Sequence, residues 1–406
     1  MKNKTIELKI ERLAGLADGM GISEGRKVFV PYSSEGDLLT VEIIKTTADA
    51  DYGKIIEIIK PGTGRIKPEC KHFGACGGCS MQHISKMEYL DFKQKTADLA
   101  ISKAGFNIKA EKIVTIPQNS RRRATFKLEN GKVGFYEEGS HNIVDMEECL
   151  ILDPELFNFI KDIKPSLISL PEITKMQVNK VANGYDLVLE CRNLTQEKIQ
   201  KAGLYKNELI RRISFRIKDK IQIIHTKGKI TIAVSGVQVP LPPQAFLQAS
   251  VFAENKMINL VTDSVKNSKN ILDLFSGIGT YSINLAKFSK VTAIEIDAEM
   301  VKALQSVNVN NLTVTRRDLF AKPLDKKELS VYDAIVINPP RTGAKAQCEL
   351  ISLSSVPKVT MVSCNPATFS RDARILKQGG YNLKKVTPID QFVYSSHLEL
   401  VAEFDK

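Results

Sequence analysis

Three cysteines lie within ten residues of one another, at Cys70, Cys76 and Cys79, and a fourth follows at Cys149. The two glycines between Cys76 and Cys79 allow the tight turn that neighbouring sulfurs need to face one metal centre. Zinc ions and iron–sulfur clusters both usually take four such ligands. In a reducing cytoplasm, clustered cysteines are metal ligands or catalysts more often than disulfide partners. The spacing therefore predicts a metal centre, with Cys149 available as its fourth ligand.

A further cysteine, Cys364, stands apart in the run Ser-Cys-Asn-Pro at 363–366. It follows a predicted strand and precedes a predicted helix, whose dipole favours the nucleophilic thiolate by lowering the thiol pKa. A lone cysteine is also commonly a buried small hydrophobe, so the residues alone leave both interpretations open. Cys191 and Cys348 lack such a context and are interpreted as structural. Glu399 alternates with apolar neighbours on the last predicted strand, which by itself indicates an exposed acid.

Residues 273–280 read Asp-Leu-Phe-Ser-Gly-Ile-Gly-Thr and connect a predicted strand to a predicted helix. Glycines at such a turn let the backbone approach a ligand closely, and the helix N-terminus offers free N–H groups. Glu295 ends the next predicted strand, where an acid can accept both hydroxyl groups of a ribose. Asn338 opens the run Asn-Pro-Pro-Arg, whose prolines fix an irregular loop at the same edge of the sheet. Together these features indicate a nucleoside site.

The charge of the chain is consistent with a polyanionic partner. Its 58 Lys and Arg stand against 46 Asp and Glu, a formal net charge of +12. Charge alone fits a basic protein without nucleic acid equally well. The most basic run, 120–127, carries three consecutive arginines and Phe126, and it could lie along a phosphate backbone or form a solvated face. No leader or membrane-length apolar stretch is evident, so we expect a cytoplasmic protein without a membrane partner.

The elements that must position these residues divide into three regions. Residues 1–60 show short β-rich runs between Gly and Pro turns, typical of a small oligonucleotide-binding barrel, with Gly15, Gly19, Gly21 and Gly25 crowding the first connection. Residues 61–245 open with the cysteines, continue into a helix near 86–104, and predict a central α+β domain. Residues 246–406 predict an α/β fold, because apolar strands alternate there with helices.

The third region predicts a doubly wound, seven-stranded sheet, in which ligands bind at the carboxyl ends of the strands. The last two strands have no helix between them, which predicts an antiparallel hairpin at the end of the sheet. The predicted strands span 270–275, 291–296, 312–315, 333–337, 358–363, 382–386 and 398–404.

These separated motifs, in this order, resemble the RNA 5-methyluridine methyltransferase family, in particular its ribosomal-RNA members. The resemblance covers essentially the whole chain and includes Phe246-Leu247-Gln248 and His397-Leu398-Glu399. It implies a class I S-adenosylmethionine-dependent methyltransferase domain at 246–406, an N-terminal TRAM barrel and a [4Fe–4S] cluster on the four cysteines named above. It makes Cys364 the nucleophile and Glu399 the base. The implied donor-binding residues are Gln248, Phe275, Gly277, Thr280, Glu295, Asp318 and Asn338.

The chain departs from the family pattern at three of these positions. The family usually has Asp where this chain has Asn338, between the methyl donor and the target base. An amide there can still accept from uracil N3–H and donate to O4. Asp318 and Thr280 stand where relatives often have Asn.

The resemblance implies methylation of carbon 5 of a flipped or unpaired uridine through a covalent cysteine adduct on carbon 6, by a monomer. We favour 23S ribosomal RNA over transfer RNA, because tRNA-specific relatives generally lack the barrel and the cluster. A cytosine-C5 enzyme would carry its nucleophile after the proline of the fourth-strand loop, where Arg341 follows Pro340. A methylthiotransferase would need a shorter gap between the first two cysteines. A non-catalytic RNA-binding protein is the remaining alternative.

Overall fold

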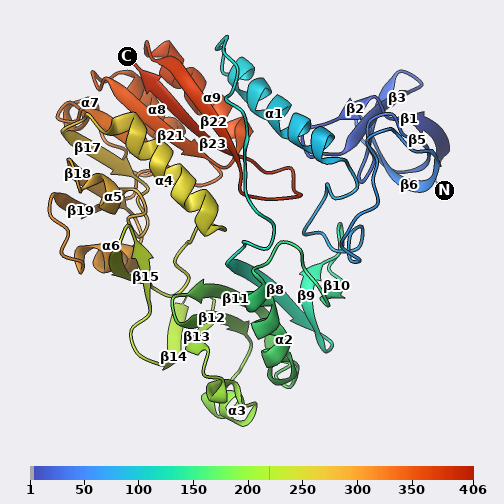
Figure 1. Ribbon diagram of the computed structural model, residues 1–406, viewed down its shortest axis with the longest axis horizontal. Coiled ribbons are helices and arrows are strands. Elements are labelled where there is room, and N and C mark those ends of the chain that lie inside the picture. The colour runs from blue at the N-terminus through green and yellow to red at the C-terminus, as the bar shows by residue number, and fades with distance from the viewer. Residues whose placement is uncertain (1–3, 219) are drawn as a thin grey trace.

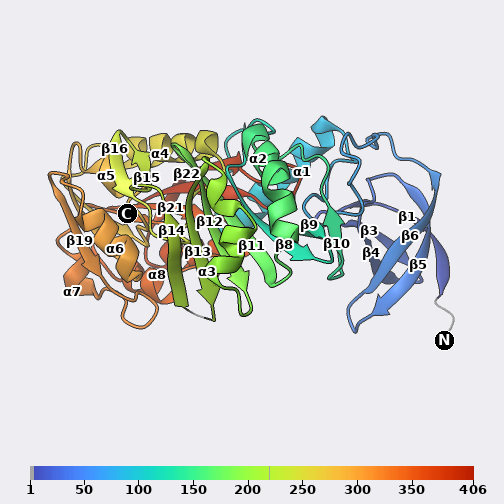
Figure 2. The ribbon, with the colours of Figure 1, turned by 90° about the horizontal axis from the view of Figure 1, so that it is seen from below.

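The computed structural model describes residues 4–218 and 220–406 as a chain with three large sheets. The N-terminal sheet lies at one end of the molecule, the C-terminal sheet at the other, and the central sheet between and below them (Figures 1 and 2). Within the described residues, none of the helices combines the length and apolar character that crossing a membrane requires.

The N-terminal sheet has six strands in the order β1-β5-β6-β4-β3-β2. They pack around Leu8, Ile10, Val28, Val30, Leu39 and Val41. Their bounds are β1 Thr5–Lys9, β2 Arg12–Leu13, β3 Gly19–Ser23, β4 Arg26–Val30, β5 Leu38–Thr46 and β6 Asp51–Lys60.

Two glycines lie in a strand that the sequence indicates as a connection. Gly19 and Gly21 belong to β3, which pairs with β4. A Cβ added at Gly19 would stand 2.0 Å from Ser33 Oγ, and one at Gly21 would stand 2.3 Å from the Lys9 carbonyl oxygen. The glycines therefore permit close approach of neighbouring segments rather than a turn.

The central sheet has seven strands in the order β10-β9-β8-β11-β12-β13-β14, and a separate hairpin, β15–β16, follows it. Helix α2 begins after Asp153, whose carboxylate accepts from the N–H groups of Glu155 and Leu156, and it packs on this sheet through Phe159 and Ile163. The bounds are β8 Arg123–Glu129, β9 Lys132–Tyr136, β10 Ile143–Asp145, α2 Pro154–Ile168, β11 Ile173–Val181, β12 Gly184–Cys191, α3 Gln196–Lys201, the 3₁₀ helix Leu204–Lys206, β13 Ile210–Ile217, β14 Lys220–Thr226, β15 Thr231–Val234 and β16 Val237–Pro240.

The C-terminal sheet has the order β19-β18-β17-β20-β21-β23-β22-β7. The predicted hairpin is present as the antiparallel pair β22–β23, but the sheet has eight strands rather than seven. The bounds are α4 Val251–Val265, β17 Asn270–Leu274, α5 Ser282–Leu285, β18 Lys290–Glu295, α6 Ala298–Gln305, β19 Leu312–Arg316, α7 Lys326–Leu329, β20 Ala334–Ile337, α8 Lys345–Ser352, β21 Lys358–Ser363, α9 Pro366–Gln378, β22 Asn382–Asp390 and β23 Glu399–Asp405.

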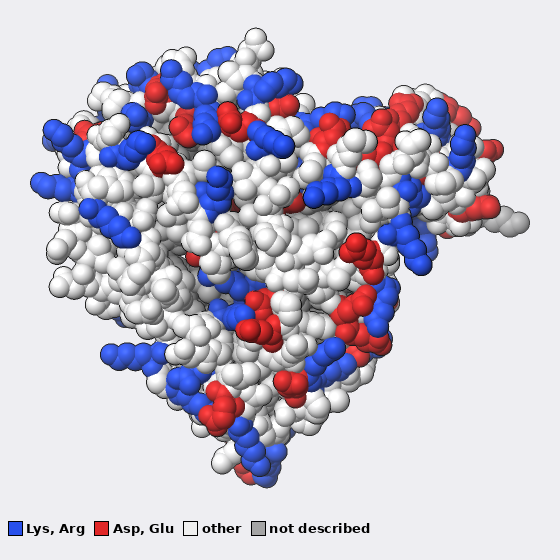
Figure 3. All heavy atoms as spheres, viewed as in Figure 1, with Lys and Arg blue, Asp and Glu red and all other residues white. Residues whose placement is uncertain are grey.

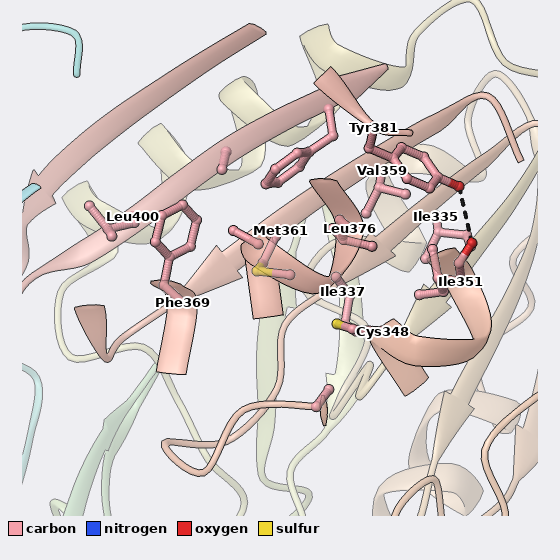
Figure 4. Packing of buried hydrophobic residues seen from close by; sticks show 14 of the residues in the cluster. Ile335, Ile337, Cys348, Ile351, Val359, Met361, Phe369, Leu376, Tyr381 and Leu400 are labelled. Carbon is pink, nitrogen blue, oxygen red and sulfur yellow. Dashed lines mark hydrogen bonds between the residues drawn. The ribbon is translucent and has the colours of Figure 1, made fainter. Parts of the chain in front are cut away.

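The eighth strand, β7 (Val114–Thr115), and helix α1 (Lys86–Lys103) come from earlier in the sequence, within 61–245. Strand β7 pairs in parallel with the end of β22. Helix α1 buries Ala97 and Ile101 in the same core as Phe369 of α9 and the C-terminal sheet. Figure 1 shows α1 beside β22 and α9, and Figure 4 shows the packing of this core around Phe369, Met361 and Tyr381. An early segment thus completes the sheet that carries the site.

Candidate active site

Cys364 lies in the turn between β21 and α9, at the carboxyl edge of the sheet. Its neighbour Asn365 begins the helix, because its side-chain oxygen accepts from the Ala367 N–H at 3.0 Å and Pro366 fills the first turn. Burial raises the pKa of the half-buried Cys364 thiol to about 11, and the charge of Glu399 adds to that rise. The predicted lowering of this pKa is therefore wrong, because loss of water on burial is the largest effect on the thiol.

Glu399 and Cys364 each lie next to the last residue pair of two adjacent strands. Strands β21 and β23 are antiparallel with Ser363 opposite Leu400 as the last pair, so Cys364 directly follows this pair on one strand and Glu399 directly precedes it on the other. The two side chains are close enough for the charge of Glu399 to raise the pKa of the Cys364 thiol. Glu399 is 4% exposed, and burial raises the pKa of its carboxyl group to about 8. The exposed acid that its spacing indicates is wrong, since β23 lies inside the sheet between β21 and β22.

A buried amide connects Glu399 to a residue of another segment. Gln391 Nε2 donates to Glu399 Oε1 at 3.1 Å and to Gln248 Oε1 at 3.0 Å. Both Gln248 and Gln391 are buried, and Gln391 Oε1 has no hydrogen-bond partner among the described residues. The sequence does not single out Gln391, because this residue lies just past a strand and outside any motif.

The loop that follows β20 is attached to the Cys364 turn. The Arg341 carbonyl oxygen accepts from Asn365 Nδ2 at 3.0 Å and from Thr368 Oγ1 at 3.2 Å. The Arg341 guanidinium lies 3.2 Å from His397 Nδ1, on the segment that leads into β23. Its positive charge acts to lower the pKa of the Cys364 thiol, against the larger effect of burial.

Glu295 ends β18 and is fixed there by three backbone donors. The Gly277 N–H donates to Oε2 at 2.9 Å, and the N–H groups of Ile296 and Asp297 donate to Oε1 at 2.8 and 2.9 Å. Gly277 takes a positive φ of 56°, which glycine tolerates without strain. The carboxylate thus ties the glycine turn after β17 to the end of β18.

The other residues predicted to bind the methyl donor lie at the same edge of the sheet. Phe275 follows β17, and its ring lies 5.5 Å from that of Phe320. Asp318 accepts from the Phe320 N–H at 2.9 Å, which shapes the turn after β19. Half-buried Asn338 follows β20 and donates its N–H to the Leu274 carbonyl oxygen at 3.3 Å. Half-buried Thr280 precedes a helix, α5, of only four residues.

Asp273 is a buried acid of β17, and the sequence did not indicate it as a ligand. Ser282 Oγ donates to its Oδ2, whereas its Oδ1 has no partner among the described residues. Burial raises the pKa of Asp273 to about 7. The unpaired oxygen is a potential acceptor for a ligand that carries a donor group.

Cys364 lines a cavity of about 340 Å³. The walls of this cavity come from three places: Gly15 and Leu16 between β2 and β3, Leu99 and Lys103 of α1, and the turns that carry Arg341, Cys364 and His397. Cys364 is therefore reachable from a space that is partly apolar and partly cationic.

Comparison with known proteins agrees with this geometry. A family model described as tRNA (Uracil-5-)-methyltransferase matches residues 191–403. An RNA methyltransferase of Agrobacterium fabrum, described as uncharacterized, is 34% identical over 100% of both chains. The chain belongs to the tRNA (uracil-5-)-methyltransferase family. It is thus an RNA (uracil-C5-)-methyltransferase with a class I methyltransferase sheet.

Two further relatives of this methyltransferase have named targets. A 23S rRNA (uracil(1939)-C(5))-methyltransferase of Vibrio campbellii is 27% identical over 98% of this chain and 95% of its own. The tRNA (uracil-54, C5)-methyltransferase of Pyrococcus abyssi, solved with S-adenosyl-L-homocysteine, has a TM-score of 0.73 at 22% identity and covers 98% of this chain and 99% of its own. The latter establishes similarity of fold.

In the basic run of the methyltransferase, residues 120–127, side chains contact other parts of the protein. Arg122 Nη2 pairs with Glu254 Oε2 at 2.7 Å, and the Arg123 guanidinium lies 4.6 Å from the centre of the Phe246 ring. Phe126 is fully buried against Phe135. The phosphate-binding interpretation of this run is therefore not supported, because its side chains are engaged internally. On the face in Figure 3, Lys and Arg are spread widely, and some lie in a hollow near the middle.

The four clustered cysteines line one cavity of about 270 Å³ together with Arg121. Burial raises the pKa of the Cys79 thiol to about 12 and also raises those of Cys76 and Cys149. Across residues 4–218 and 220–406, no three His, Cys, Asp or Glu side chains are grouped so as to hold a metal ion. The cysteines thus surround a space without converging on one point.

Proposed function

We propose that the methyltransferase modifies carbon 5 of uridine through a covalent bond between Cys364 and carbon 6 of the base. The pairing of β21 with β23 carries this proposal, because Cys364 and Glu399 flank its last residue pair, at the carboxyl edge of the sheet. A nucleophile and a buried acid that face each other can attack one ring and remove its proton.

In the proposed reaction, the Cys364 thiolate adds to carbon 6, and the electron pair of the 5,6 double bond makes carbon 5 nucleophilic. S-adenosylmethionine supplies the methyl group that carbon 5 takes up. The Glu399 carboxylate then removes the proton from carbon 5, the double bond re-forms, and the thiolate leaves. Arg341 favours the thiolate electrostatically, and the high pKa of Glu399 makes its carboxylate a strong base.

We propose that the donor lies over the turns after β17, β18 and β19, with the ribose hydroxyls on Glu295. Phe275, Gly277, Thr280 and Asp318 shape the surrounding pocket. Gln248 reaches this pocket from the segment before α4, where its side chain meets Gln391. Asn338, between donor and base, can accept from uracil N3–H and donate to O4.

The target uridine must leave its stack to reach Cys364, because the thiol is half-buried. We propose that it enters through the cavity beside Leu16 and Leu99, whose Lys103 and Arg341 attract the RNA backbone. Residues 1–60 would act as a TRAM-like RNA-binding barrel and 61–245 as the central iron–sulfur domain. Residues 246–406 would form the methyltransferase domain, to which α1 and β7 of the central region add, in a monomer.

We propose 23S ribosomal RNA as the substrate, supported by the Vibrio campbellii relative. Transfer RNA is the second candidate, favoured by the full-length likeness to the Pyrococcus abyssi tRNA enzyme. We expected tRNA-specific relatives generally to lack the barrel and the cluster. The likeness to one tRNA enzyme over nearly the whole chain keeps transfer RNA as a candidate. Mapping 5-methyluridine in both RNA classes from a deletion strain separates the candidates, since the modification disappears from one class alone.

We propose further that Cys70, Cys76, Cys79 and Cys149 would hold a [4Fe–4S] cluster. Four thiols around one cavity fit a polynuclear group, whose ligands stand farther apart than those of a single ion. The proposed reaction transfers no electrons, so the cluster would organise the fold.

The reaction is tested with RNA that contains 5-fluorouridine, because fluorine on carbon 5 cannot leave as a proton. Wild-type enzyme should form an adduct that survives a denaturing gel, and Cys364→Ala should form none. Glu399→Gln should accumulate a methylated covalent complex with ordinary uridine RNA, because attack and methyl transfer remain possible. Adduct formation by Cys364→Ala, or normal turnover by Glu399→Gln, would contradict these assignments.

A further inference from the structure

Lys93, on α1, is fully buried, and the hydrogen bonds of its ammonium group all go to one segment. Its Nζ donates to Asp390 Oδ1 at 2.8 Å, to the His397 carbonyl oxygen and, more distantly, to the Phe392 carbonyl oxygen at 3.5 Å. One acceptor is the last residue of β22, Asp390, and the other two lie between β22 and β23. Residues 390–398 are called the connection below. Since an ammonium has three donors, the binding capacity of Lys93 is used entirely on this connection.

Two other contacts hold the same connection from the same side. Tyr89, one turn before Lys93 on α1, donates its hydroxyl to Asp390 Oδ2 and accepts from the Tyr394 N–H at 3.0 Å. The Tyr394 carbonyl oxygen accepts from the N–H groups of Ser80 and Met81 at 2.8 and 3.1 Å. Ser80 directly follows Cys79, so the connection is also attached to the cysteine-lined cavity.

The connection reaches the reacting groups at both of its ends. Asp390 is followed by Gln391, which donates to the Glu399 carboxylate. His397 lies two residues before Glu399 and contacts Arg341. We propose that Lys93 is a positioning residue for proton removal: its ammonium sets the conformation of residues 390–398 and so the place of the Glu399 carboxylate relative to Cys364. The inference rests on the proposed function.

Cys364 itself is held differently. Its turn is fixed by Asn365 at the start of α9 and by the Arg341 carbonyl oxygen, and Lys93 takes part in neither contact. The connection meets this turn only indirectly, through the Arg341 guanidinium beside His397. Loss of Lys93 should therefore slow proton removal by Glu399 more than it slows attack by the Cys364 thiolate. This separation distinguishes positioning from a general loss of folded protein.

The test compares two double variants that each remove a buried ion pair. Lys93→Met with Asp390→Asn removes both charges of the pair at the connection, so that neither is left buried alone. Arg212→Met with Asp186→Asn removes the equally buried pair of the central sheet, joined at 2.7 and 2.8 Å, as the matched control. Tyr89→Phe is a milder variant that deletes one hydroxyl from the Lys93 network.

For each folded variant, adduct formation on 5-fluorouridine RNA measures attack, and release from ordinary uridine RNA measures proton removal. The double variant of Lys93 and Asp390, called the Lys93 pair, should form the adduct at a rate within about threefold of wild type. It should release product about tenfold more slowly, so that methylated complex accumulates. Tyr89→Phe should show a smaller change in the same direction, and the Arg212 pair should accumulate no complex. S-adenosylhomocysteine should bind all variants alike by calorimetry.

Normal release by the Lys93 pair and by Tyr89→Phe would overturn the positioning role. Equal slowing of adduct formation and release would overturn it as well, because that pattern reports general damage. If the Lys93 pair does not fold, Tyr89→Phe alone decides between these outcomes. A wild-type enzyme that forms no adduct would instead overturn the covalent mechanism itself, and with it the inference.

Discussion

The side-chain amide of Gln391 donates to the carboxylate of Glu399 at 3.1 Å, in an interior where the acid is almost fully shielded from water. Burial raises the pKa of Glu399 to about 8, and this hydrogen bond lowers it, because it stabilises the charged form. The amide therefore helps Glu399 to be ionised near neutral pH.

The first prediction follows from this bond. Proton removal needs the carboxylate, so the release rate should rise with pH to a plateau with a midpoint near 8. Gln391→Leu should move that midpoint to higher pH, because it removes the stabilising donor. Single-turnover release across pH 6–10 measures both midpoints, and Gln196→Leu, on α3 of the central region, is the control. A lower or unchanged midpoint in Gln391→Leu would contradict the role of the bond.

The free energy of unfolding should change with pH in the direction opposite to that of the release rate. The folded pKa of Glu399 is raised above its unfolded value, so between about pH 4.5 and 8 the folded state binds more protons than the unfolded state. The contribution of Glu399 to the free energy of unfolding therefore falls as pH rises through this window. Glu399→Gln should gain stability relative to wild type over the same window, as measured by urea unfolding. A constant difference between the two proteins would show that Glu399 is not buried as described.

Loss of the Glu295 carboxylate should weaken donor binding. Glu295→Ala should reduce S-adenosylmethionine affinity by about 1–3 kcal/mol, the scale of losing charged hydrogen bonds. Calorimetry measures the change, and Glu299→Ala on the exposed side of α6 is the control. Equal affinity in Glu295→Ala and wild type would remove Glu295 from the donor site.

The internal engagement of the basic run predicts a selective effect on RNA binding. Replacing the Arg122–Glu254 pair by Met and Gln should leave the salt dependence of RNA affinity unchanged. Lys103→Ala, at the exposed end of α1 beside the Cys364 cavity, should lower the slope of log affinity against log salt by about 1. Filter binding at several salt concentrations tests both, and the reverse pattern would restore the phosphate-binding interpretation of the run.

The cysteine-lined cavity predicts bound iron. Protein purified without oxygen should carry about four iron atoms per chain, as a cubane with four thiolate ligands requires. Cys76→Ala should lower iron content and folded yield together. Cys191→Ala, a buried cysteine of the central sheet outside the cavity, should keep the iron. Stoichiometric zinc without iron in wild type would contradict the proposal.

The sequence predicted the strands of the C-terminal sheet well, because runs such as Lys358–Ser363 are apolar and end at Gly, Pro or polar turns. It could not reveal β7, whose two residues owe their strand conformation to pairing with β22. Nor could periodicity show that α1 packs against α9, since an apolar helix face does not name its partner.

For the site, motifs indicated residues but not their surroundings. The direction of the Cys364 pKa was wrong because burial depends on the whole fold. Gln391 and Lys93 were missed for a related reason: a glutamine after a strand and a lysine on a helix are ordinary until the fold brings each to Glu399 or its connection.

The place of α1 and β7 in the C-terminal sheet also affects the order in which the chain can fold during translation. Both segments leave the ribosome before the central sheet exists, yet their packing partners in α9 and β22 are among the last residues made. The apolar face of α1 must therefore remain uncovered while some 250 further residues are synthesised. A fragment that starts near residue 246 would lack α1 and β7, so the apolar groups that these elements cover on the C-terminal sheet and α9 would be exposed to water.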